Sequence, residues 1–281
     1  MALNNPILIT GKRGGVAKSL QRCLSTHNLP FVALGQREMD ITNKKKVMEV
    51  IGQWKPSIII HTAAMTDVDR GENEFQRMIE INLHGTKNIL DGARTFSSSI
   101  MYVSSDFVFD GKKKVPYDSA DRPTPINQYG YTKWLGEEYV RRYPGLWWIV
   151  RTSSLFGGGA GFVDFVAHKG RKGEKIMVVE DQVSSPTYIE DLSKDLLNLL
   201  EQPAGIYHVT NRGECSKFEL AQFIYEKVGA PMKLVTAITS KEWNAPASRP
   251  SYSTLQPNVV VQRHWKEAVE EYLVRRGWLD D

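Results

Sequence analysis

Short apolar runs rich in β-branched residues alternate with longer amphipathic stretches through the first half of the chain. The apolar runs lie at 7–10, 31–34, 58–61, 100–103 and 147–150. Runs of this length are typical of strands buried on both faces of a parallel sheet. Helix-like patterns lie between them, at 15–26, 43–54, 74–96 and 127–143. This alternation predicts an α/β fold with a doubly wound parallel sheet of the Rossmann type.

The pattern changes in the second half of the chain. A glycine-rich loop lies at 157–161, and the later elements are shorter and interrupted by prolines. We therefore expect a dinucleotide-binding domain over 1–153, and over 154–281 mainly a smaller, interleaved substrate-binding lobe. Residues 185–210 are expected to return to the first sheet, because they end in a further strand-like run. The cleft between the two parts is the expected ligand site.

Composition and charge limit the partners. The 281 residues carry a formal net charge of only +4, with Lys and Arg scattered, which argues against a nucleic-acid partner. The chain has no apolar run of about 18 residues and no basic segment before a long apolar run near its start, so we expect neither a membrane segment nor a signal peptide. Cys23 and Cys215 fit no metal spacing and favour a reducing compartment. A cytoplasmic protein is the expectation.

A glycine motif joins the first predicted strand to the first predicted helix. It has the form Gly11-x-x-Gly14-x-x-Ala17. Gly11 permits a sharp turn, Gly14 lets the backbone approach a pyrophosphate, and Ala17 lets the helix pack closely on the strand. The phosphates would then meet the N-terminus of the helix. The motif predicts a dinucleotide cofactor.

Basic residues near this motif favour NADPH, with NADH as the alternative. In many dinucleotide sites an acid at the end of the second strand binds the ribose 2′-hydroxyl. Here Arg37 precedes the first acid, Glu38, and together with Lys12 and Arg13 it would suit a 2′-phosphate. The other interpretation is that these cations are merely solvated. The expected cofactor-binding residues are Gly11, Lys12, Arg13, Gly14, Gly15, Val16, Arg37, Asp40, Ile41, Ala63, Ala64, Asn82, Tyr129 and Lys133.

Three residues form a candidate proton-transfer site. Ser105 ends the fourth predicted strand, at the ligand-binding edge of such a sheet, and Tyr129 and Lys133 lie one turn apart on the next predicted helix. Reduction of a ketone needs a proton for the developing alkoxide. A phenol has an unperturbed pKa of about 10, and a neighbouring ammonium lowers a pKa by roughly 1–3 units. We therefore expect Lys133, together with an oxidised nicotinamide cation, to lower the pKa of Tyr129, and Ser105 to hold the carbonyl oxygen.

These motifs resemble the extended short-chain dehydrogenase/reductase family, and more closely its dTDP-4-dehydrorhamnose reductase branch. The resemblance covers nearly the whole chain. It is carried by "AAMTDVD" at 63–69, "VSSDFVFDG" at 103–111, "YGYTKWLGE" at 129–137, "VRTSSLFG" at 150–157, "VVEDQVSSPTYIEDL" at 178–192, "GIYHVTNRGECS" at 205–216 and "ASRPSYSTL" at 247–255, besides the glycine motif. It implies NADPH-dependent reduction of the C4 ketone of a nucleotide-linked 4-keto-6-deoxyhexose. The leading reaction is dTDP-4-dehydrorhamnose to dTDP-rhamnose, which feeds polysaccharide biosynthesis.

The resemblance also assigns roles to individual residues. It makes Tyr129 the general acid, Lys133 its tuner and a ligand of the nicotinamide ribose, and Ser105 the hydroxyl where the branch commonly has threonine. The implied substrate-binding residues are Thr66, Ser105, Phe107, Ser154, Gln182 and Arg249. Asp181 and Pro186 match positions that shape the nucleotide-sugar side of the cleft. Metal-binding acids reported for some members are not recognisable, so no metal is expected.

Departures from the branch leave alternatives open. Phe107 replaces a usual tyrosine, and Ser154 replaces a tryptophan that faces the sugar. A UDP-linked 4-keto-6-deoxy-N-acetylhexosamine is therefore the alternative substrate. A non-catalytic NADP-binding regulatory subunit and an epimerase are rivals of other classes, whereas a dehydratase is less expected because no glutamate follows Asp106. The oligomeric state stays open, with a homodimer as one option.

Overall fold

A six-stranded parallel sheet forms the larger of two lobes in the computed structural model, which describes residues 5–258 and 263–279. The strands run in the order β2-β1-β3-β4-β5-β10 across the sheet, each parallel to its neighbours. Their bounds are β1 (Ile7–Thr10), β2 (Phe31–Leu34), β3 (Ile58–His61), β4 (Ser99–Ser105), β5 (Trp147–Thr152) and β10 (Gly205–His208). The predicted doubly wound fold is confirmed.

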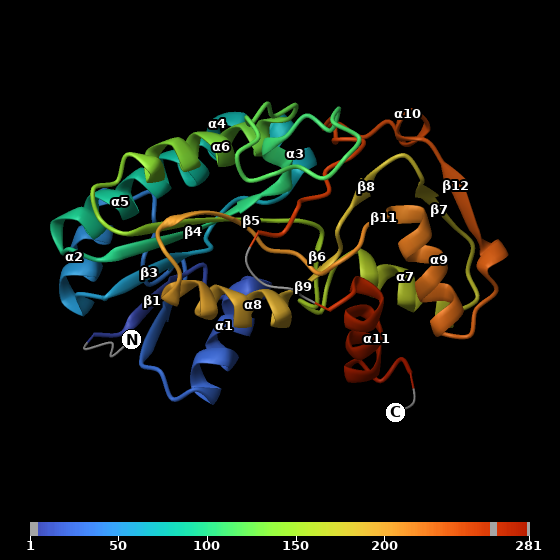
Figure 1. Cartoon of the computed structure of the whole chain (residues 1–281), viewed down its shortest axis with the longest axis horizontal. Coiled ribbons are helices and arrows are strands. Elements are labelled where there is room, and N and C mark those ends of the chain that lie inside the picture. Colours follow the sequence, from blue (N-terminus) through green and yellow to red (C-terminus); the bar gives the residue numbers. More distant parts are fainter. Residues whose placement is uncertain (1–4, 259–262, 280–281) are drawn as a thin grey trace.

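Helices cover both faces of this sheet, as Figure 1 shows. One face carries α1 (Gly15–Thr26) and α8 (Ile189–Asn198), and the other carries α2 (Lys44–Trp54), α5 (Gly85–Thr95) and α6 (Gln128–Arg141). Alternate residues of each strand serve the two faces. In β1, Ile7 and Ile9 pack with leucines of α1 and α8, whereas Leu8 packs with apolar residues of α2 and α5. The sheet is therefore the centre of a three-layer core.

The segment predicted as one long helix over 74–96 consists of three pieces. After α3 (Val68–Asn73), the chain forms α4 (Phe75–Met78), a π-helical segment η1 (Ile79–His84) and then α5. Short π-helical turns are rare and occur often at functional sites. This one contains the buried Asn82, whose partners are described with the site.

The smaller lobe has its own core and three short two-stranded sheets. Its sheets pair β6 (Leu155–Phe156) with β9 (Thr187–Tyr188), β7 (Ile176–Val179) with β12 (Val235–Ile238), and β8 (Val183–Ser184) with β11 (Cys215–Ser216). Its helices are α7 (Phe162–Arg171), α9 (Lys217–Lys227), α10 (Ser240–Trp243) and α11 (Trp265–Arg275). The short 3-10 turn Met232–Leu234 belongs to this lobe, whereas those at Asp106–Val108 and Leu199–Glu201 follow β4 and α8 of the larger lobe. The lobe's core is rich in aromatic side chains, among them Phe156, Tyr188 and Tyr225.

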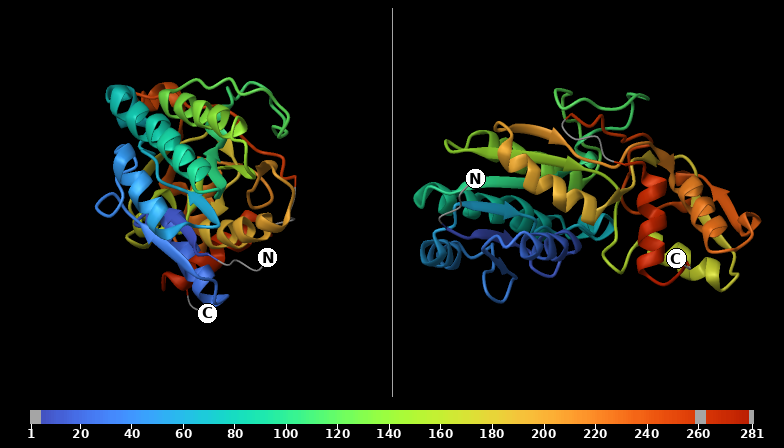
Figure 2. Two further views of the ribbon diagram at one scale, coloured as in Figure 1. Left: turned by 90° about the vertical axis from the view of Figure 1, so that its left-hand side faces the viewer. Right: turned by 60° about the horizontal axis from the view of Figure 1, so that its bottom comes forward.

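The chain passes between the lobes more than once. It leaves the sheet after β5, builds part of the smaller lobe, and returns through α8 to β10 before it completes the smaller lobe. The right-hand view in Figure 2 shows the two lobes side by side, with α11, the last helix, in the smaller one. Because the strands are parallel, their carboxyl ends meet at one edge of the sheet, where ligands of such folds bind. None of the described helices has the length and apolar character that a membrane span requires.

Candidate active site

An elongated cavity of about 1270 Å³ follows the carboxyl edge of the sheet and continues into the smaller lobe. Its lining runs from the glycine motif, past the ends of β3, β4 and β5, to β8 and the start of α9. The cavity therefore has a cofactor end on the sheet and a substrate end that both lobes share.

The glycine motif has a backbone that only small residues allow. Gly11 has φ +73°, and a Cβ atom there would lie 3.0 Å from the backbone of Ala63. Helix α1 then begins after Gly14 with no side-chain cap and no acid in its first turn. Its first amide groups thus have no side-chain acceptor, which suits a phosphate. Gly11, Gly14, Gly15 and Val16 all line the cavity.

The three predicted cations around this motif do not behave alike. Lys12 donates to Glu38 (3.2 Å) and is absent from the cavity lining. Arg13 and Arg37 line the cavity, and neither forms an ion pair with a residue that the structure describes. Asp40 and Ile41 lie beside them in the lining. In this structure the Lys12 ammonium is thus paired with the acid that follows Arg37, and its expected role in cofactor binding stays a prediction.

Asn82 supports the cavity without lining it. Its amide accepts a hydrogen bond from Met65 N (2.7 Å) and donates to Met65 O and Thr132 Oγ1 (both 3.1 Å). These bonds fix the loop after β3 against α6. Ala63, Ala64 and Met65 on that loop do line the cavity. Asn82 thus positions residues that line the cavity, and its expected part in cofactor binding stays a prediction.

Ser105, Tyr129 and Lys133 all line this cavity, and Tyr129 forms a hydrogen bond with Ser105. Asn127 begins α6 by accepting a hydrogen bond from Gly130 N (2.7 Å). A Cβ atom on Gly130 would lie only 2.0 Å from Phe107 O, so the glycine permits the helix to press against the end of β4. This close approach brings Tyr129, at the start of the helix, to the strand end that carries Ser105.

Burial sets the protonation of the pair on α6. It raises the pKa of Tyr129 to about 12, partly offset by the hydrogen bond with Ser105. It lowers the pKa of Lys133 to about 7, although the Glu137 carboxylate opposes the shift. Lys133 Nζ lies 4.0 Å from the centroid of the Tyr102 ring. Loss of water thus keeps the proton on Tyr129 at neutral pH. The lowering of the phenol pKa predicted from the helical spacing, which also depends on the bound cofactor, stays a prediction.

A buried carboxylate holds Ser105 in place. Asp106 accepts hydrogen bonds from Ser105 Oγ (3.0 Å), Ser153 Oγ (2.8 Å) and Ser253 Oγ (2.6 Å). Ser105 ends β4, Ser153 follows β5, and Ser253 is tied to β8 of the smaller lobe, because its N–H donates to Val183 O (2.9 Å). Burial raises the pKa of Asp106, and the three hydroxyls partly offset the rise. The orientation of Ser105 therefore depends on both lobes.

A buried ion pair lies beneath the site. Arg151 donates to Glu137 through Nε (2.9 Å) and Nη2 (2.7 Å), and both side chains are only 1% exposed. Ser104 Oγ donates to the same carboxylate at 2.6 Å, and the Arg151 guanidinium lies 5.0 Å from the centre of the Phe109 ring. Glu137 follows Lys133 by one turn of α6. The pair therefore fixes the helix that carries Tyr129 and Lys133 to β5.

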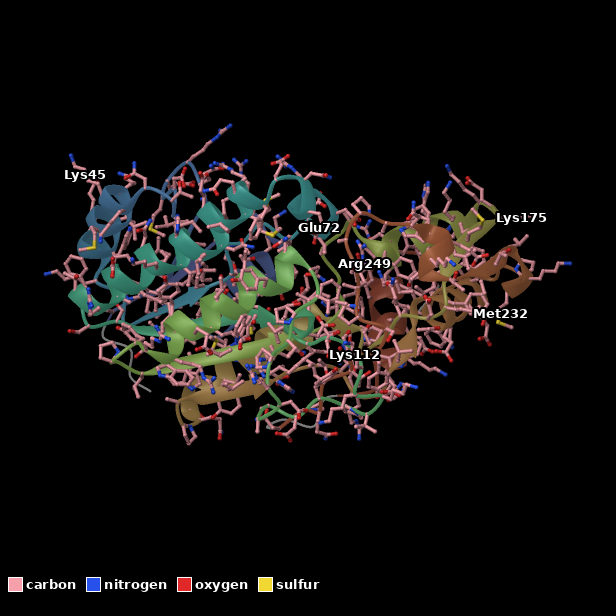
Figure 3. The ribbon with its side chains drawn as sticks, turned by 90° about the horizontal axis from the view of Figure 1, so that it is seen from above. Lys45, Glu72, Lys112, Lys175, Met232 and Arg249 are labelled. Atoms are coloured by element: carbon pink, nitrogen blue, oxygen red, sulfur yellow. The ribbon has the colours of Figure 1, made fainter. Side chains whose placement is uncertain are left out.

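The substrate end of the cavity contains every residue assigned to it by the resemblance: Thr66, Ser105, Phe107, Ser154, Gln182 and Arg249. Arg249 forms a two-point ion pair with Asp69 (2.9 and 2.7 Å) and lies where the two lobes meet, as Figure 3 shows. Ser154 Oγ lies 2.5 Å from Ser184 Oγ, so two hydroxyls stand where the resemblance led us to expect an aromatic wall. Asp181 and Pro186 are absent from the lining, and Asp181 instead accepts hydrogen bonds from Ser240.

Sequence reasoning missed Lys217, Thr152 and the role of Asp106. Lys217 lines the substrate end as the first residue of α9. A signal was present, because Ser216 and Glu219 form a capping box, a pattern that predicts a helix start in the sequence. Thr152 Oγ1, at the end of β5, is buried and has no hydrogen-bond partner in the described structure, so it suits a polar ligand group.

Within residues 5–258 and 263–279, no three His, Cys, Asp or Glu side chains gather closely enough to hold a metal ion. The cavity instead brings together the uncapped N-terminus of α1, which can bind a phosphate, and Arg13 and Arg37, which have no ion-pair partner among the described residues. It also contains the Thr152 hydroxyl, which has no hydrogen-bond partner there. These features fit NADPH, and the residues that would hold it are Gly11, Arg13, Gly14, Gly15, Val16, Arg37, Ala63, Ala64 and Thr152.

Comparisons with known proteins agree over almost the whole chain. The model of the RmlD substrate binding domain matches residues 5–276. The spore coat polysaccharide biosynthesis protein SpsK of Bacillus subtilis is 34% identical over 277 residues, which cover 96% of this chain and 98% of that protein. The dTDP-4-dehydrorhamnose reductase of Aggregatibacter actinomycetemcomitans is 33% identical and covers 91% of this chain and 92% of its own. A crystal structure of dTDP-4-dehydrorhamnose reductase from Bacillus anthracis in complex with NADP has a TM-score of 0.92, 35% identity, and coverage of 96% and 99%.

Proposed function

Because the chain belongs to the dTDP-4-dehydrorhamnose reductase branch of the extended short-chain dehydrogenase/reductase family, we propose that it reduces dTDP-4-dehydrorhamnose to dTDP-rhamnose with NADPH. The observation that carries the proposal is the meeting of Ser105, Tyr129 and Lys133 between a phosphate seat and a polar substrate end. Relatives that match this chain over more than nine tenths of its length and are named dTDP-4-dehydrorhamnose reductases support the same reaction.

The proposed chemistry assigns one task to each residue. NADPH, when bound, supplies the hydride for C4 of the sugar. Tyr129 Oη gives its proton to the C4 oxygen, and a pKa of about 12 keeps that proton on the phenol until the oxygen becomes basic. Ser105 Oγ, whose one hydrogen is donated to Asp106 in this structure, would turn that hydrogen to the same oxygen and orient it. Lys133, one turn away and with a pKa of about 7, can return a proton to Tyr129 at neutral pH.

Net consumption of NADPH tests the function. We expect purified protein to oxidise NADPH, followed at 340 nm, when dTDP-4-dehydrorhamnose is added, with one dTDP-rhamnose formed for each NADPH used. Comparing kcat/KM with a UDP-linked 4-keto-6-deoxy-N-acetylhexosamine ranks the two substrates. Tight NADPH binding without turnover of either sugar would instead support a regulatory subunit, and sugar conversion without NADPH loss would support an epimerase.

The two unpaired arginines give a prediction about cofactor choice. Replacing both Arg13 and Arg37 with alanine should lower kcat/KM for NADPH by about 10- to 100-fold, because hydrogen bonds to a charged phosphate contribute roughly 1.5–3 kcal/mol. The value for NADH should change by less than about threefold, and steady-state kinetics with each cofactor measure both.

Lys12→Ala is the matched control for this double variant. Its ammonium pairs with Glu38, at 46% side-chain exposure, so we expect only a small loss with NADPH. Equal losses with NADPH and NADH in the arginine variant would contradict a 2′-phosphate site at this end of the cavity.

A further inference from the structure

Lys217 is a cation at the substrate end of the cavity that the proposed chemistry does not use. Its backbone is held from both sides: its own N–H donates to Gln182 O (3.3 Å), and the preceding β11 pairs with β8. The side chain is largely withdrawn from solvent and lines the cavity. A long, flexible side chain is thus anchored at its base beside the ligand space.

This ammonium has no partner of opposite charge. No carboxylate in the described structure lies within ion-pair distance of Lys217 Nζ, and no hydrogen bond to it is formed there. Its near neighbour is the ring of Phe162, with the ring centre 5.7 Å away. The other cations of this end are already paired, Arg249 with Asp69 and Arg70 with Glu74.

The surroundings of Lys217 raise the free-energy cost of its unpaired positive charge. Burial, and then the charge of Arg249, lower the pKa of Lys217, although the carboxylates of Asp106 and Asp69 oppose them. Those carboxylates already have partners, three serines and Arg249 respectively. Charged side chains that are largely removed from solvent are normally paired with an opposite charge or bound to a ligand. A negatively charged ligand group would supply the missing partner.

We propose that Lys217 binds an anionic oxygen group of the sugar-nucleotide substrate, beside the Ser154 and Ser184 hydroxyls. The proposal rests on the proposed function, because it concerns the ligand of the same cavity. Two parts of sugar nucleotides carry this chemistry: the diphosphate that links nucleoside and sugar, which dTDP-4-dehydrorhamnose has, and a carboxylate on the sugar, which it lacks. A carboxylate partner would therefore mean that the substrate is another sugar nucleotide. In either case Lys217 contributes to substrate recognition and not to proton transfer.

Ligand binding separates the two sources. Calorimetry on the NADP⁺-loaded protein would compare the wild type with Lys217→Met, using dTDP, thymidine, UDP-glucose and UDP-glucuronate. If the group is the diphosphate, Lys217→Met weakens dTDP and both UDP-sugars by about 10- to 100-fold and leaves thymidine unchanged. If the group is a carboxylate, only UDP-glucuronate weakens by that amount. Lys217→Arg should recover most of the loss in either case.

Lys175→Met is the control for the loss of one lysine charge. Lys175 is exposed, lies at the far end of the smaller lobe in Figure 3, and takes no part in the cavity lining. Its binding constants should equal those of the wild type. Four ligands bound within twofold by Lys217→Met, or no binding of the charged ligands by the wild type, would overturn the proposal. NADPH oxidation by the wild type with dTDP-4-dehydrorhamnose tests the proposed function separately, since it needs no Lys217 variant.

Discussion

Replacing Tyr129 with phenylalanine should lower kcat for dTDP-4-dehydrorhamnose by about 10²- to 10⁴-fold, the usual contribution of a positioned general acid. The change removes one oxygen and keeps the ring that packs edge-on against Phe107, 6.1 Å between centres. The cavity and its glycine motif should stay intact. Steady-state NADPH oxidation measures kcat, and fluorescence titration should show an unchanged Kd for NADPH.

Tyr131→Phe is the control on the same helix. Tyr131 is 39% exposed and does not line the cavity, so its hydroxyl should be dispensable and kcat should remain within twofold of the wild type. A Tyr129→Phe variant that retains more than a tenth of wild-type kcat would exclude the phenol as the proton donor.

Replacing Arg151 with methionine should lower the free energy of unfolding by about 3–5 kcal/mol, because it strands the buried Glu137 carboxylate without its partner. Urea unfolding followed by circular dichroism measures the change. The double variant Glu137→Leu with Arg151→Met should lose less than the single variant, since it leaves no buried charge unpaired.

An exposed pair on the same helix provides the comparison. Arg141 and Glu138 lie 3.4 Å apart at the surface, so Arg141→Met should cost less than about 1 kcal/mol. A loss for Arg151→Met no larger than that for Arg141→Met would mean that the buried pair does not fix α6 to β5 as described.

Periodic patterns predicted the sheet well because the signal is local. Strands of four or more apolar residues and helices with one apolar face can be recognised without any tertiary contact. The exception is the break of the predicted helix over 74–96 at η1. There Asn82 bonds to Met65 and Thr132, and neither partner can be found from periodicity.

The candidate site was predictable where residue type and spacing carry the chemistry, as for the glycine motif and for Tyr129 with Lys133. The site was not predictable where the role of a side chain depends on a partner that lies far away in the sequence. Lys12 and Arg13 are adjacent in sequence, yet only Lys12 meets Glu38, 26 residues away. The pKa of Tyr129 likewise depends on how much water the fold removes, which spacing alone does not reveal. Lys217 likewise could be recognised as a candidate only from the structure, because its sequence position does not reveal that its ammonium lacks an ion-pair partner in the described residues.

The carboxylate of Asp106 has a consequence for protein engineering. Asp106 accepts hydrogen bonds from the hydroxyls of Ser105 and Ser153, at the edge of the sheet, and of Ser253, which is tied to the smaller lobe. The two lobes are therefore not independent modules. A hybrid that took its smaller lobe from another reductase would keep a correctly oriented Ser105 only if the donor supplied a hydroxyl in place of Ser253. Grafted specificity in this scaffold therefore has to be designed together with that one contact.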